Sequence, residues 1–279
     1  MRQGGPAGLE RRGPLRQLRE AGRPARRGQG LARPLLQRRH LHLRRAERVQ
    51  PLPQAGPPRP QGRVPEGGSV KGWGAVSDFD GTITLRDVGD HLLLHYGFAD
   101  KRTIEESYSL KVRVEDFMKR AFAGAALSER VIADFVRERV KARRGFREFI
   151  LFCEANGVPF EIASGGVDLY ADPFFAKHGV SVKSFFGRAK VVEGGIKIDY
   201  PFLRRTDLSS FKASRVARMK RLGLKVVFFG DGPNDFKAAS LADKAYATGR
   251  LLRLCRERGV PASPLTDFTR AAAYIKRHS

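Results

Sequence analysis

Short apolar runs of strand length alternate with helical patterns along residues 70–279, and this alternation limits the fold more than any other feature of the sequence. Three runs are typical of buried strands and a fourth resembles them: GWGAVSD (72–78), VPFEIAS (158–164), LKVVFFGD (224–231) and KAYAT (244–248). Helical patterns occupy FREFILFCEANG, DFKAASLAD and TDFTRAAAYIKRHS. Strands that alternate with helices form a parallel sheet covered by helices. The pattern therefore predicts an α/β fold.

Residues 86–145 interrupt the alternation with successive helical patterns and no convincing strand. TIEESYSL begins with a capping box from Thr103 to Glu106, and SERVIADFVRERV is amphipathic. We expect this segment to be a helical cap inserted after the first strand, so that residues 70–85 and 146–279 form the core. Further on, VVEGGIKIDYPF (191–202) alternates around a Gly-Gly turn and predicts a β-hairpin.

The first 69 residues have a composition from which no folded core can form. They contain sixteen arginines and no lysine, four glutamates and no aspartate, and no Phe, Tyr, Trp, Ile, Cys, Asn or Thr. We expect this Arg/Pro/Gly-rich leader to be disordered. Amino acids with AT-rich codons are missing before Lys71, so we interpret the leader as translated upstream DNA, with the true start at Val70. A real arginine-rich arm that binds polyanions is the alternative.

The formal net charge of the chain is +24, and the excess of basic residues continues beyond the leader. A basic surface attracts phosphorylated anions, but it is equally typical of a solvated face without a partner. No zinc-finger spacing or RNA-recognition signature accompanies the charge, so nucleic-acid binding is only an alternative function. Two cysteines, Cys153 and Cys255, are too few for a disulfide framework. No apolar stretch reaches the roughly 18 residues of a membrane span, and we expect a cytoplasmic protein without a membrane partner.

Polar side chains collect where the predicted strands end. Because ligands bind outside the carboxyl ends of parallel strands, we expect these side chains to meet at one edge of the sheet. Side chains two positions apart share a strand face, so the two aspartates of SDFDGTIT (77–84) are predicted to converge. Three strand ends and one helix start supply the set: Asp78 and Asp80, Ser164 with the turn residues Gly165 and Gly166, Asp231 and Asp235, and Lys212.

The chemistry of this set is complementary, although Asp and Gly are also ordinary turn residues. Clustered carboxylates with room for water form a hard-oxygen site that suits Mg²⁺. A serine hydroxyl, a lysine ammonium and the free amides of a Gly-Gly turn donate hydrogen bonds to phosphate oxygens. The combination predicts a phosphoryl-transfer site.

The four motifs resemble, in the same order, those of the haloacid dehalogenase (HAD) superfamily of aspartate-nucleophile phosphatases. The resemblance rests on DFDGT, SGG, a lone lysine and GDGPND, which span most of residues 74–240. It implies a Rossmann-like core, a Mg²⁺ cofactor and hydrolysis of a small phosphorylated metabolite through an aspartyl-phosphate.

The resemblance also implies a role for each motif residue. Asp78 is expected to be the nucleophile, and Asp80 the acid that protonates the leaving alcohol and then the base that activates water. Ser164 and the amide of Gly165 are expected to hold the phosphoryl oxygens, and Lys212 to bridge phosphate and Asp78. The expected metal ligands are Asp78, Asp80, Asp231 and Asp235. Gly81, Thr82 and Asn234 complete the expected phosphate site.

A helical cap between the first two motifs resembles the phosphoserine phosphatase branch. The stretches DFDGTITLRD, SGGVDLYADP and LLRLCRERGVP resemble the methionine-salvage phosphatases that act on 2-hydroxy-3-keto-5-methylthiopentenyl-1-phosphate. We expect the cap to set specificity. The candidate residues that contact the substrate there are Asp87, Asp90, His91 and Arg113. A phosphomutase built on the same motifs remains an alternative, and the sequence does not predict an oligomeric state.

Overall fold

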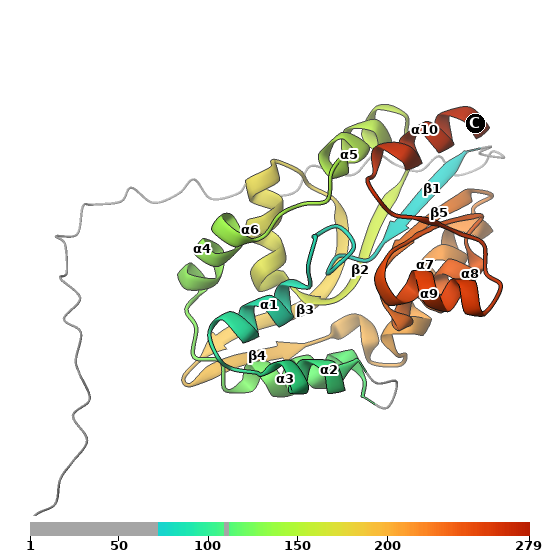
Figure 1. Cartoon of the computed structure of the whole chain (residues 1–279). Coiled ribbons are helices and arrows are strands. Elements are labelled where there is room, and N and C mark those ends of the chain that lie inside the picture. The colour runs from blue at the N-terminus through green and yellow to red at the C-terminus, as the bar shows by residue number, and fades with distance from the viewer. Residues whose placement is uncertain (1–71, 109–111) are drawn as a thin grey trace, which may run out of the picture. The chain divides into compact units, whose positions relative to one another are not determined.

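The computed structural model describes residues 72–108 and 112–279, and the expectations for residues 1–69 lie outside them. Figure 1 shows a central sheet with helices on both faces. The strands are β1 (Trp73–Ser77), β2 (Phe160–Val167), β3 (Lys183–Val192), β4 (Gly195–Asp199), β5 (Lys225–Gly230), β6 (Lys244–Ala247) and β7 (Ala262–Pro264). The helices are α1 (Val88–His95), α2 (Lys101–Ser107), α3 (Val114–Ala123), α4 (Glu129–Arg139), α5 (Phe146–Ala155), α6 (Asp168–His178), η1 (Pro201–Leu203), α7 (Leu208–Arg221), η2 (Pro233–Asp235), α8 (Phe236–Leu241), α9 (Gly249–Glu257) and α10 (Thr269–His278).

The seven strands follow the order β4-β3-β2-β1-β5-β6-β7. All neighbours are parallel except β3 and β4, which form the predicted antiparallel hairpin. Val76 on β1 pairs with Glu161 on β2 and with Phe228 on β5. The three strands that carry the motifs are therefore adjacent, so their carboxyl ends meet at one edge of the sheet. The predicted α/β class is confirmed.

Two apolar cores hold helices against the sheet, because successive strand residues point to opposite faces. On one face, Phe229 packs with Phe149 of α5 and Phe268 before α10, at ring-centroid distances of 5.3 and 4.7 Å. On the other face, Phe228 packs with α7, α8 and α9, the helices at the right of Figure 1. Burial of such large side chains contributes roughly 1.5–3 kcal/mol each, so the sheet is a rigid support for its edge.

Five helices, α1 to α5, lie between β1 and β2 in the chain, and the first four of them fall within residues 86–145. The predicted capping box at Thr103 and Glu106 is wrong. The cap residue is Asp100, whose Oδ1 accepts a hydrogen bond from the Thr103 amide at 2.8 Å, and α2 already begins at Lys101. Aspartate caps a helix as well as threonine does, and the earlier residue satisfies an amide of the first turn. The division into core and cap stays a prediction.

A second difference concerns the expected Gly-Gly turn after Ser164. The strand β2 continues through Ser164, Gly165 and Gly166 to Val167, and its register with β3 shifts between Ala163 and Val167. The irregularity replaces a turn, because Gly165 and Gly166 let the strand pass close to neighbouring side chains.

Each helix within the described ranges is too short or too polar to cross a bilayer.

Candidate active site at the carboxyl edge of the sheet

The loop after β1 is a tight turn built on one carbonyl group. The Phe79 carbonyl oxygen accepts hydrogen bonds from the amides of Thr82, Ile83 and Thr84, while the Phe79 ring is fully buried. Gly81 has φ +71°, and a Cβ there would lie 2.3 Å from Asp231 Oδ2. Only glycine tolerates both the conformation and this approach, so the loop is pressed against the end of β5.

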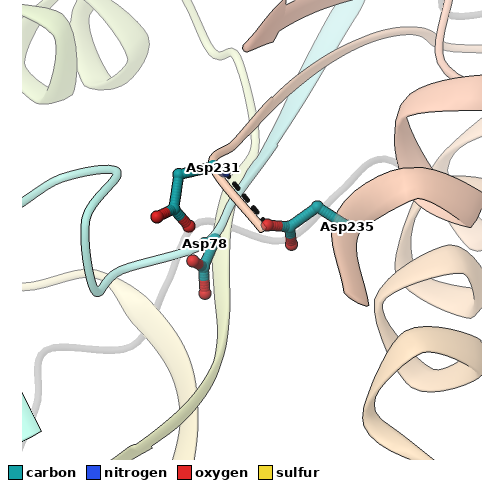
Figure 2. Close-up of side chains that lie close together, drawn as sticks. All are labelled: Asp78, Asp231 and Asp235. Atoms are coloured by element: carbon teal, nitrogen blue, oxygen red, sulfur yellow. Dashed lines mark hydrogen bonds between the residues drawn. The ribbon is translucent and has the colours of Figure 1, made fainter. Parts of the chain in front are cut away.

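Three carboxylates converge where β1 and β5 end (Figure 2). One oxygen from each of Asp78, Asp231 and Asp235 lies within 4.8 Å of the others. Asp235 Oδ2 accepts hydrogen bonds from the Asp231 and Gly232 amides at 3.1 and 3.0 Å, which fixes the turn into η2. The predicted ligands Asp78, Asp231 and Asp235 are thus brought together.

Lys212 of α7 reaches into this cluster from the side. Its Nζ lies 2.8 Å from Asp78 Oδ1 and 2.7 Å from Asp235 Oδ1, and its side chain is 3% exposed. Burial lowers the pKa of Lys212, but Asp235 and Asp78 raise it by more, so the ammonium stays charged. One cation is therefore shared between two carboxylates, and both are ordered by the contact.

Burial and the crowding of negative charge raise the pKa of two of the carboxylates, Asp78 and Asp231. Burial raises the pKa of Asp78 to about 6, with Lys212 opposing the change. Burial and the neighbouring Asp78 raise the pKa of Asp231 well above its usual range. A divalent cation would relieve this repulsion, and the all-oxygen donor set suits Mg²⁺.

Asp80 is not part of this carboxylate cluster, and its assignment as a metal ligand stays a prediction. Its Oδ1 accepts from the Val88 amide at 2.9 Å, and its Oδ2 accepts from the Tyr170 hydroxyl at 2.9 Å. Ser164 Oγ lies 3.4 Å from the same Oδ2. These donors turn the carboxyl away, because a two-residue spacing fixes a shared face only inside a strand and Asp80 lies in the turn. Burial raises its pKa to about 7.

The strand β2 is shaped to fit around Asp80. A Cβ on Gly166 would lie 2.3 Å from Asp80 Oδ2 and 2.3 Å from the Tyr170 hydroxyl. The Gly166 amide donates to Ser164 Oγ at 3.0 Å, and the Gly165 carbonyl accepts from the Tyr200 hydroxyl at 2.6 Å. The serine hydroxyl is thereby held next to Asp80.

Two further predicted phosphate-binding residues lie beside the carboxylates. The Thr82 hydroxyl is 3.4 Å from Asp78 Oδ2 and 3.5 Å from Asp231 Oδ1. Asn234 lies on η2, the short helix that also ends in Asp235.

The predicted specificity residues divide into two groups. Asp87 caps α1 by accepting from the Asp90 amide at 2.8 Å, and burial, Asp80 and Asp90 raise its pKa well above the usual range. Asp90 accepts a hydrogen bond from Tyr108. By contrast, Arg113 Nε donates to Glu115 at 2.7 Å, and the His91 ring packs on Phe135 at 5.0 Å. Arg113 is thus engaged with its own helix α3, and His91 packs against α4.

Sequence reasoning missed four residues that shape the site: Arg143, Tyr170, Tyr108 and Arg250. Arg143 donates from Nε to the Thr82 carbonyl and from Nη2 to the Gly81 carbonyl, both at 2.7 Å. Nothing near Arg143 in the sequence signals this contact, since 61 positions separate it from Thr82. Tyr170 stands inside the motif stretch SGGVDLYADP, so its position was the one available signal.

Comparisons with known proteins place these residues in context. A family model for haloacid dehalogenase-like hydrolase matches residues 75–240. The chain is 27% identical over 200 residues to a 2-hydroxy-3-keto-5-methylthiopentenyl-1-phosphate phosphatase of Bacillus velezensis, covering 69% of this chain and 85% of that protein. It is 28% identical over 205 residues to a protein of the same name from Exiguobacterium sibiricum, covering 69% and 91%.

Solved structures have the same fold. A structure titled as a phospho-aspartyl intermediate analogue of phosphoserine phosphatase aligns with TM-score 0.57 and 20% identity, over 74% of this chain and 99% of that one. Phosphoserine phosphatase from T. onnurineus aligns with TM-score 0.53 and 22% identity, over 75% and 96%.

Proposed function

The chain belongs to the haloacid dehalogenase-like hydrolase family, and we propose that it is a Mg²⁺-dependent phosphatase that hydrolyses a small phosphomonoester through an aspartyl-phosphate on Asp78. One observation carries the proposal: buried Lys212 holds Asp78 and Asp235 at 2.8 and 2.7 Å, beside Asp231 at the carboxyl edge of the sheet. This small cluster can thus provide a nucleophile, a cation that binds phosphate and a set of metal ligands.

The metal would be held by Asp78, Asp231 and Asp235. When bound, Mg²⁺ supplies positive charge that neutralises the phosphoryl oxygens and the crowded carboxylates. Lys212 adds a fixed ammonium next to Asp78, and the Thr82 and Ser164 hydroxyls would donate to the same phosphoryl group.

In the first step, an Asp78 carboxylate oxygen forms a bond to phosphorus and the bond from phosphorus to the leaving alcohol oxygen breaks. Asp80 gives its proton to that oxygen. A pKa of about 7 makes Asp80 suited to hold a proton near neutral pH, and Tyr170 and Val88 fix its orientation. In the second step, Asp80 takes a proton from water, the water oxygen bonds to phosphorus, and the Asp78–phosphorus bond breaks to release inorganic phosphate.

The substrate we propose is a small phosphorylated metabolite. Two named relatives are phosphatases of 2-hydroxy-3-keto-5-methylthiopentenyl-1-phosphate, and this compound is the first to test. Phosphoserine is the second, because phosphoserine phosphatases are among the solved structures that share the fold.

The test measures phosphate release from p-nitrophenyl phosphate and from both metabolites. Wild type should be active with Mg²⁺, inactive with EDTA, and active again when Mg²⁺ is restored. Asp78→Asn should lose on the order of 10³-fold or more in kcat, as expected when a covalent nucleophile is removed. Asp199→Asn, the same change on an exposed residue of β4, is the matched control. Appearance of an isomeric phosphate ester without free phosphate would indicate a mutase instead, and substantial activity of Asp78→Asn would reject the proposal.

A further inference from the structure

Arg250 in the first turn of α9 has an unsatisfied donor. Its Nη1 is buried and has no hydrogen-bond partner among residues 72–108 and 112–279. The guanidinium carbon lies over the Tyr108 ring, 3.9 Å from its centroid, in a cation–π contact. Buried donors without partners are rare and costly in native proteins. A ligand that accepts from this nitrogen would account for the arrangement.

The position of Arg250 is tied to the metal-binding loop. The Leu251 amide donates to the Asp231 carbonyl at 2.7 Å, and a Cβ on Gly249 would lie 3.2 Å from the same oxygen. The residues on both sides of Arg250 are therefore packed on the backbone of Asp231. Burial raises the pKa of Asp90 and the charge of Arg250 opposes this rise, so the guanidinium lies within electrostatic range of the Asp90 carboxylate.

Tyr108 approaches Arg250 from the helical segment between β1 and β2. Its hydroxyl donates to Asp90, and burial together with the charges of Asp87, Asp90 and Asp231 raises its pKa. The ring thus lies within electrostatic range of Asp231 while it stacks on Arg250. Arg250 and Tyr108 bring a core helix and an insertion helix together next to the site.

We infer that Arg250, oriented by Tyr108, binds an acceptor oxygen in the part of the substrate that is not transferred, so that the enzyme prefers phosphomonoesters that carry a carboxylate or ketone oxygen. This inference rests on the proposed function, since it assigns the substrate class of the same site. A guanidinium has donors and no acceptor, so its complement is an anionic or carbonyl oxygen. Its charge also disfavours an ammonium group at that position.

Two pairs of probes separate the acceptor chemistry from the phosphoryl group. Phosphoglycolate and ethyl phosphate differ by a carboxylate, and dihydroxyacetone phosphate and propyl phosphate differ mainly by a ketone. Dissociation constants are measured by calorimetry with Mg²⁺ in the Asp78→Asn background, where no turnover interferes. At least one acceptor-bearing probe should bind more tightly than its partner, by roughly 10- to 100-fold, the effect of one hydrogen bond to a charged group. The pair of probes that shows the preference identifies whether Arg250 binds a carboxylate or a ketone oxygen.

Arg250→Met should remove most of that preference, and Arg250→Lys should restore only part of it, because an ammonium lacks the planar fork. Arg253→Met on the same helix, an exposed arginine, is the matched control and should keep the full preference. A ratio near one in both pairs, or a ratio that Arg250→Met leaves unchanged, overturns the inference. Absence of phosphate release by wild type on every substrate would reject the proposed function separately, because the binding ratios are measured without turnover.

Discussion

Lys212 lies beside Asp78 and Asp235, and Arg250 lies within electrostatic range of Asp90; the two cations differ in how completely the chain satisfies their hydrogen-bond donors. Lys212 is buried between Asp78 and Asp235, at 2.8 and 2.7 Å. Arg250 stacks on Tyr108 and leaves its buried Nη1 without a partner. The group around Lys212 is ordered by the protein alone, whereas the group around Arg250 lacks an acceptor that a ligand would supply. We therefore propose that phosphoryl chemistry and substrate choice depend on separate groups of residues.

After the loss of the nucleophile Asp78, the largest effect is expected at Asp80, which belongs to neither group because Val88, Tyr170 and Ser164 hold its carboxyl. Asp80→Asn should lower kcat by roughly 10² to 10⁴-fold, the range for a lost acid-base group. The factor should be similar for all alkyl phosphates, since protonation of the leaving oxygen is common to them, and smaller for p-nitrophenyl phosphate. Steady-state kinetics on both classes check this. If the decrease in kcat differed between substrates with and without a carboxylate or ketone oxygen, the separation of the two groups would be contradicted.

The second effect concerns stability and compares the two cations directly. Lys212→Met leaves Asp78 and Asp235 buried without their cation, and breaking such a pair costs about 3–5 kcal/mol. Arg250→Met removes a donor that has no partner, so the free energy of unfolding should change far less. Denaturant unfolding of both variants without Mg²⁺ measures the difference. Equal losses would mean that Arg250 is as firmly integrated in the fold as Lys212.

The smallest effect is expected at the N-terminus of α7, the helix that carries Lys212. Asp207 accepts from the Ser210 amide at 2.8 Å, and this hydrogen bond lowers the pKa of Asp207. A carboxyl with a lowered folded-state pKa stabilises the fold above its unfolded pKa, and the contribution is lost as pH falls through the folded value. Asp207→Ala should therefore cost about 1 kcal/mol at neutral pH and almost nothing in strong acid.

Unfolding of wild type and Asp207→Ala across the acid range checks this pH dependence. Asp199→Ala, at an exposed aspartate of β4, is the control. A difference between wild type and Asp207→Ala that grew as the pH fell would show that the cap is not the source of the effect.

Local sequence patterns were enough to predict the strands of the sheet and the motif residues that meet at its edge. Apolar runs and the motifs at their ends located β1, β2, β5 and β6, and the rule for parallel strands brought Asp78, Asp231, Asp235 and Lys212 together. Two local features were misassigned, since Asp100 rather than Thr103 caps α2 and the predicted Gly-Gly turn is a strand irregularity. In both places the local sequence allows more than one structure, and tertiary packing decides which one forms.

Contacts across long stretches of chain had no local signal. The Arg143 contact with the Gly81 and Thr82 carbonyls and the Arg250 stack on Tyr108 join segments that are distant in sequence. The orientation of Asp80 also depends on such a contact, because Tyr170 comes from α6. Residues such as Arg143 and Tyr170, which contact the motif residues from distant parts of the chain, can therefore be identified only from the folded structure.

The most direct test of the proposed chemistry is to trap the phosphoryl group on the protein. Wild-type enzyme is mixed with Mg²⁺ and substrate, quenched rapidly in acid and reduced with borohydride, which converts an aspartyl-phosphate to homoserine. Peptide mass spectrometry then locates the modified residue. We expect homoserine at position 78 and none in Asp78→Asn. Modification at Asp80, or no modification anywhere while phosphate is released in steady turnover, would contradict nucleophilic attack by Asp78.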